Sequence, residues 1–102
     1  MSDKPLTFSD FSPHLKTKFY IHYNENSVPL ETELVEVKEL KSDREKNLGK
    51  GFSLIFLGDS ESLLEQKIYQ IKHDVMGENA IFIVPIGPDP GNRRMRYQAI
   101  FN

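Results

Sequence analysis

The sequence predicts a mainly β domain, in which about six antiparallel strands curl into a small barrel or sandwich after a short N-terminal helical turn. Three observations predict this fold class. Short apolar runs recur along the chain with turn residues between them, helical patterns cover only a few residues, and two of the runs are apolar on both faces. A small sheet with two such strands buries both of their faces by curling over itself.

Composition bounds the size and the chemistry of the domain. The chain has 102 residues, of which 30 are Leu, Ile, Val or Phe, and this is enough for one modest core. We expect residues 1–5 to form a flexible tail and residues 6–102 to form a single β domain. Cysteine is absent, which excludes disulfides and thiolate metal sites. A net charge of −2 gives no overall attraction to nucleic acid or anionic lipid.

The first element expected is a short helical turn near residues 9–15. Ser9 or Ser12 can act as its N-cap, and Pro13 suits a first helical position. Three apolar side chains are expected to hold the turn against the core: Phe8, Phe11 and Leu15.

Two strands follow. Residues 18–23 alternate, with Phe19, Ile21 and Tyr23 expected on one face, and a second strand is expected over about residues 28–40. The apolar residues up to Leu34 share one phase, whereas Val35 and Val37 share the other. Because a strand cannot bury both sets on one face, we predict a β-bulge near Leu34–Val35.

The middle of the chain combines a charged loop with a fully apolar strand. Residues 41–50 are expected to form a mobile loop, and residues 52–57 a strand covered on both sides. After this strand, Ser62 and Glu65 have the spacing of a capping box, which predicts one helical turn.

Three further segments complete the sheet. Residues 67–73 are expected to form a strand with Tyr69 and Ile71 inward. Residues 80–86 give the second strand that is apolar on both faces, with Pro85 at an edge or a bulge because it cannot donate to a ladder. After a loop over residues 87–92, the last strand runs over residues 94–101 and places one set of side chains on the same face: Met95, Tyr97, Ala99 and Phe101.

Catalytic and metal-binding patterns find no support in the sequence. His14, His22 and His73 are scattered without the spacing of metal ligands, and Glu31 and Glu33 fit a solvated strand face. No serine lies in a nucleophile elbow, and no glycine-rich loop is followed by the Lys-Ser/Thr pair that binds phosphate. The sequence therefore gives no reason to expect an enzyme, a metal or a cofactor.

The strongest local charge feature is a basic run at the start of the last strand. Arg93, Arg94, Arg96 and Tyr97 form the candidate partner-binding site, in which arginines beside an aromatic ring contact an acidic partner. The alternative is that these charges only solubilise the strand and guard its edge. Given the acidic balance of the chain, we favour an acidic protein surface over nucleic acid as the partner.

The order of these segments resembles a small family of bacterial single-domain proteins of unknown function. The resemblance covers residue 6 to the end of the chain. It rests mainly on Phe52-Ser53-Leu54-Ile55-Phe56, on Val84-Pro85-Ile86-Gly87-Pro88 and on Tyr97-Gln98-Ala99-Ile100-Phe101-Asn102. It implies a stand-alone β domain, with some members encoded near phage-tail-collar-like proteins, and it implies no activity. The charged loop over residues 41–50 is longer than the turn usual in the family.

These observations leave two main functional hypotheses. The first is a non-enzymatic interaction or assembly module with a protein partner, in a tail-like or surface assembly, with self-association also open. The second is a small-ligand binder or enzyme that uses a pocket at the barrel mouth, with candidate groups His22, His73, Glu31 and Glu33. Single-strand nucleic-acid binding by the arginines is a weaker third. The N-terminus lacks an apolar signal segment, so we expect a cytoplasmic protein without a membrane partner.

Overall fold

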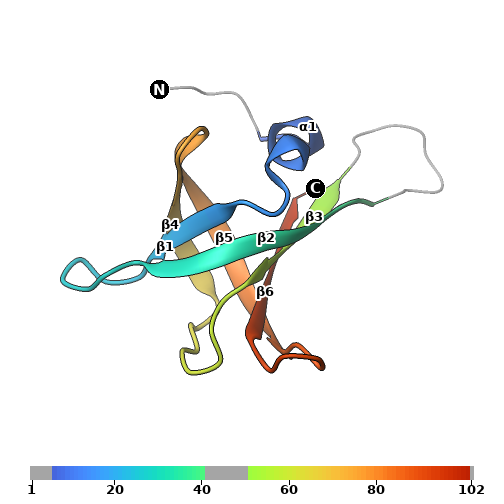
Figure 1. Ribbon diagram of the computed structural model, residues 1–102. Coiled ribbons are helices and arrows are strands. Elements are labelled where there is room, and N and C mark those ends of the chain that lie inside the picture. The colour runs from blue at the N-terminus through green and yellow to red at the C-terminus, as the bar shows by residue number, and fades with distance from the viewer. Residues whose placement is uncertain (1–5, 41–50, 102) are drawn as a thin grey trace.

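A computed structural model describes residues 6–40 and 51–101 and shows six antiparallel strands closed into a barrel (Figure 1). The strand order is β1-β2-β3-β6-β5-β4, with β4 also paired to β1. The mainly β prediction is confirmed, and of the two architectures it allowed, the chain adopts the barrel. The expectations for residues 1–5 and 41–50 lie outside the described residues. The strands are β1 (Lys18–His22), β2 (Leu30–Glu39), β3 (Phe52–Leu57), β4 (Lys67–His73), β5 (Gly77–Pro88) and β6 (Met95–Phe101).

The predicted N-terminal turn exists as α1 (Phe8–Phe11) and a 3₁₀ turn, η1 (Ser12–His14). Its N-cap is Thr7, not Ser9 or Ser12. The Thr7 hydroxyl accepts a hydrogen bond from the Asp10 amide, and the Asp10 carboxylate accepts one from the Thr7 amide. The helix therefore begins before either serine, and Pro13 falls at the start of η1.

The barrel encloses one cluster of buried side chains, to which α1 and the loop between β3 and β4 also contribute. Near α1, the buried Phe11 ring packs against Phe19, Phe52 and Phe101 with centroid separations of 6.3, 5.9 and 5.8 Å. Figure 1 shows α1 beside the ends of β3 and β6. The loop between β3 and β4 contributes the buried Leu64, close to the start of β6. The interior thus holds a packed core.

Both predicted irregularities occur as bulges. In β2, Leu34 pairs with Phe56 whereas Glu36 pairs with Ile55, so Val35 is the extra residue. This register shift lets the two phases of β2 share one interior. In β5, the register with β6 shifts after Pro85, which confirms that Pro85 lies at a bulge.

Several local expectations are wrong. Leu15 and Tyr23, expected in the core, are 40% and 43% exposed, because each lies beyond the strand or helix that would have turned it inward. The β3 strand is buried at all six residues as predicted, but on β5 Phe82 faces outward. Ile81 and Ile83 already take the interior positions, and the described residues provide no second layer over Phe82.

The capping box predicted at residues 62–65 does not form a helical turn. Instead, the Asp59 carboxylate accepts hydrogen bonds from the amides of Glu61 and Ser62 at 3.0 and 2.7 Å. The Asp59 carboxylate thus accepts the hydrogen bond of the Ser62 amide that Glu65 would accept in a capping box, and the segment forms an Asx-type turn instead of a helix. The outcome is a loop that carries Leu64 back into the core.

Candidate functional site

The candidate basic site begins in the loop between β5 and β6. The Asp89 carboxylate accepts hydrogen bonds from the amides of Gly91 and Asn92 at 2.9 and 3.2 Å, and the Asn92 side chain accepts one from the Arg94 amide at 2.9 Å. Arg93 follows in the left-handed conformation with φ of 66°, and its side chain is exposed. The loop is therefore closed by its own side chains and presents Arg93 to solvent.

Arg94 is fixed to the end of β3. Its Nε donates to the Gly58 carbonyl at 2.7 Å, and its Nη2 makes a longer contact of 3.5 Å with the Leu57 carbonyl. The side chain is half-buried. Arg94 thus ties the start of β6 to the loop that follows β3, and it still has guanidinium N–H groups available for a partner.

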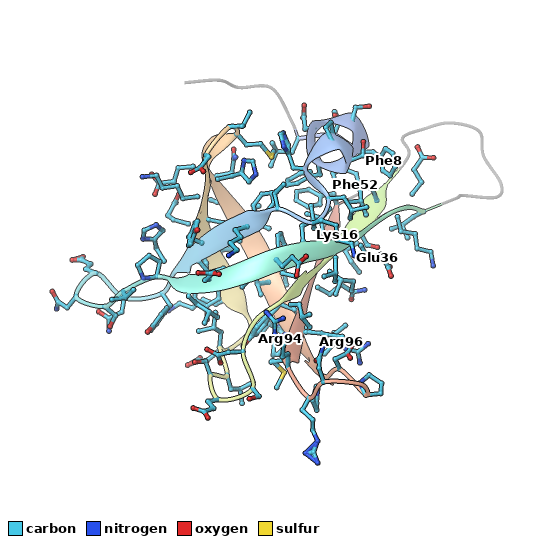
Figure 2. All side chains as sticks on the ribbon, viewed as in Figure 1. Phe8, Lys16, Glu36, Phe52, Arg94 and Arg96 are labelled. Carbon is cyan, nitrogen blue, oxygen red and sulfur yellow. The ribbon has the colours of Figure 1, made fainter. Side chains whose placement is uncertain are left out.

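Arg96 is directed toward β5 rather than β3. Its Nε donates to the Gly87 carbonyl at 3.4 Å, and its side chain is also half-buried. Figure 2 shows Arg94 and Arg96 together on the lower part of the barrel, where β6 starts. Among residues 6–40 and 51–101, Lys18 and Glu31 form an ion pair. None of these three arginines takes part in an ion pair there.

Tyr97 is not part of this surface, which corrects the expectation that its ring faces a partner. Its side chain is fully buried because odd-numbered residues of β6 point into the barrel. The Tyr97 hydroxyl donates to the Ser62 carbonyl and accepts from the Leu64 amide, both at 3.1 Å. Burial raises the pKa of Tyr97 above its ordinary value. Tyr97 therefore holds the β3–β4 loop over the end of the barrel.

His73 lies near the opposite end, where it joins three segments. Its Nδ1 accepts hydrogen bonds from the amides of Val75 and Met76 at 3.0 and 3.2 Å. Its Nε2 must then carry the proton, which it donates to the Thr17 hydroxyl at 2.9 Å. Thr17 in turn donates to the His14 carbonyl at 2.6 Å. The ring is 5% exposed, and desolvation followed by the nearby His14 lowers its pKa below 6.5.

The groups proposed for a pocket at the barrel mouth do not come together. His73 is buried near α1, whereas His22 ends β1 at the other end of the barrel. Glu31 is on β2, where its carboxylate lies 2.9 Å from the Lys18 ammonium group, and Glu33 pairs with the same residue in the strand register.

A groove does lie outside the barrel, and only His22 of those groups lines it. The groove measures about 570 Å³ and lies between the β1–β2 hairpin and the outer faces of β4 and β5. Its lining consists of His22, Tyr23, Asn24, Glu25, Ser27, Pro29, Gln70 and Glu78. The register brings Gln70 beside His22, and a sequence alone gives no signal for such a contact across 48 positions. We call this feature the acidic groove, since both of its charged residues are glutamates.

Neither a metal-binding cluster nor a membrane-spanning helix occurs in the part of the chain that the structure describes. No group of three His, Asp or Glu side chains there could hold a metal ion. No helix in that part is long and apolar enough to cross a membrane.

Comparison with known families agrees with the resemblance seen in the sequence. The family described as a domain of unknown function (DUF6916) matches residues 6–101. The chain belongs to this family. Searches of curated proteins and of solved structures found no match. Membership in the DUF6916 family therefore confirms a small domain of unknown function.

Proposed function

We propose that this DUF6916 domain is a non-enzymatic interaction module that binds an acidic protein surface through Arg93, Arg94 and Arg96. The observation that carries the proposal is that the Nε atoms of Arg94 and Arg96 donate to backbone carbonyls, to Gly58 just after β3 at 2.7 Å and to Gly87 on β5 at 3.4 Å. Such anchoring reduces the side-chain entropy lost on binding, and it leaves terminal N–H groups for a carboxylate. We call these three residues the arginine face.

Carboxylates fit the arginine face better than nucleic acid does. Proteins that bind single strands pair a basic track with exposed aromatic rings on which the bases stack. Here the neighbouring aromatic residue, Tyr97, is fully buried. The net charge of −2 also opposes the long-range attraction that a nucleic acid would need. An acidic protein segment requires only the local guanidinium groups.

Fluorescence anisotropy with a labelled Asp/Glu-rich peptide tests the proposal at low ionic strength. We expect saturable binding by the wild-type domain, and we expect the double variant Arg93→Gln/Arg96→Gln to weaken it by about tenfold or more, as for charged anchors of other interfaces. Arg94 is left in place because it also fixes the β3–β4 loop. The variant Arg94→Lys keeps the positive charge and removes the paired donors of the guanidinium group, so it tests whether these donors contribute to affinity beyond the charge.

The matched control is Lys16→Gln/Lys38→Gln, which removes the same charge from exposed lysines outside the arginine face. It should leave the affinity nearly unchanged. Equal loss in both double variants would show a nonspecific charge effect and contradict the proposal. Tighter binding of a single-stranded oligonucleotide of the same net charge would favour nucleic acid instead, and no binding to either probe would reject an anionic partner.

A further inference from the structure

We propose that the partner of the arginine face is the acidic groove of a second copy of this chain, so that the domain assembles head to tail. This inference rests on the proposed function and names its partner. The two surfaces carry opposite charge: Arg93, Arg94 and Arg96 on one, and Glu25 and Glu78 on the other.

Strand order places the two surfaces on opposite sides of the molecule. In the closed order β1-β2-β3-β6-β5-β4, the strand farthest from β1 is β6. The acidic groove is built on the end of β1, the hairpin after it and the outer faces of β4 and β5, where Glu78 lies near the start of β5. The arginine face is at the start of β6, beside Gly87 near the other end of β5. Figure 1 shows that the β1–β2 hairpin extends away from the barrel on the side away from the β5–β6 loop. One molecule therefore cannot close this contact on itself.

The acidic groove has the chemistry to accept a guanidinium group. Its lining contains neither lysine nor arginine. Lys72 lies opposite Glu78 in the register of β4 with β5, but among the described residues neither Glu78 nor Glu25 takes part in an ion pair. The Tyr23 side chain is partly exposed there, and an aromatic face also attracts a cation. The amide group of Gln70 adds an oxygen that can accept hydrogen bonds. Arg93, exposed at the tip of a loop closed by Asp89, is the residue that can enter a groove.

A contact between different surfaces on opposite sides of a subunit is heterologous, so its repetition builds rings or open filaments instead of a two-fold dimer. The same contact would give the assembly role expected from the sequence a physical basis. Because both sides are charged and solvent-facing, the association should weaken as salt rises.

Sedimentation velocity on the full chain tests the inference through two neutralised variants. Arg93→Gln/Arg96→Gln keeps the acidic groove, and Glu25→Gln/Glu78→Gln keeps the arginine face. The wild type should show a sedimentation coefficient that rises with protein concentration. Each variant alone should stay monomeric, because each lacks one half of the contact. An equimolar mixture of the two should form a one-to-one complex and nothing larger.

Control variants match the change in charge elsewhere. Lys16→Gln/Lys38→Gln and Glu36→Gln/Glu39→Gln alter exposed residues of the N-terminal segment and β2. Both should associate as the wild type does. Circular dichroism of every variant verifies that loss of association is not loss of fold.

Two results would overturn the inference. One is a wild-type chain that remains monomeric at concentrations up to about 1 mM, which corresponds to the weakest dissociation constant of interest. The other is a variant mixture that stays monomeric. Binding of the acidic peptide to the arginine face separates the two proposals. If the peptide binds while the chain remains monomeric, only self-assembly is rejected. If the peptide also fails to bind, the proposed function is rejected with it.

Discussion

At the scale of single residues, His73 shows how a neutral histidine can be required by its hydrogen bonds. Its Nδ1 accepts from two backbone amides, so a proton on that atom would face two N–H groups. His14 on η1 packs against the ring and disfavours a positive charge on His73, whereas Asp74 partly opposes this effect. The remaining contacts, Phe19 and Thr17, carry no charge. The folded state therefore prefers the neutral ring.

This preference sets a pH dependence of stability. Because the folded pKa of His73 lies below 6.5, the unfolded chain binds a proton there between pH 6.5 and the folded pKa while the folded chain does not. The free energy of unfolding should be unaffected by His73 above pH 6.5 and should fall as the pH drops through that window. Urea unfolding between neutral pH and about pH 5 measures it.

The variant His73→Asn isolates this contribution. An Asn carbonyl can accept from the Val75 and Met76 amides but cannot titrate, so the variant should lose the slope that the wild type shows below pH 6.5. His22→Asn, at an exposed position, should keep that slope. A wild-type slope that survives His73→Asn would refute the assignment.

Tyr97 gives a second test at this scale. Removing its hydroxyl in Tyr97→Phe leaves the Leu64 amide and the Ser62 carbonyl without their partner. We expect a loss of about 1–3 kcal/mol of unfolding free energy, measured by thermal or urea unfolding. Tyr23→Phe, in which the ring is exposed, should cost little. Equal costs in the two variants would show that the buried hydroxyl does not hold the β3–β4 loop.

At the scale of elements, the β5 bulge depends on one glycine. Gly87 has φ of 102°, a conformation that side chains disfavour, and its carbonyl accepts the Arg96 hydrogen bond. We expect Gly87→Ala to lower the unfolding free energy by at least about 1 kcal/mol and to weaken binding at the arginine face. Gly91→Ala, where an added Cβ meets only the Asp89 carboxylate at 3.2 Å, should cost less. The reverse order would contradict this role of Gly87.

Features that depend on the local residue pattern could be predicted from the sequence. Features that depend on which of two acceptors takes a hydrogen bond, or on which parts of the fold cover a strand, could not. The phase change after Leu34 predicted the β2 bulge, because side-chain alternation is a local property of a strand. The capping box predicted at Ser62 does not form, because Asp59, three residues earlier, accepts the hydrogen bond of the Ser62 amide that Glu65 would have accepted. Phe82 resembled a core residue, yet whether a second layer covers a strand depends on the rest of the fold.

At the scale of the whole molecule, barrel closure decides which residues meet. The sequence placed Arg94 and Arg96 on one strand, and it could not show that Arg94 reaches Gly58 while Arg96 reaches Gly87. It also could not show the acidic groove, since Gln70 and Glu78 join His22 only through the pairing of β1 with β4 and of β4 with β5. Contacts of this kind depend on strand order, which no local pattern encodes.

The central claim is that the arginine face binds an acidic surface, and a chemical-shift map tests it most directly. The isotope-labelled domain would be titrated with the Asp/Glu-rich peptide while its backbone amide and arginine side-chain signals are followed. We expect saturable shifts that cluster at Arg93, Arg94, Arg96, Gly58 and Gly87, which the arginine hydrogen bonds connect. Shifts that are absent, that do not saturate, or that cluster away from these residues would contradict the claim.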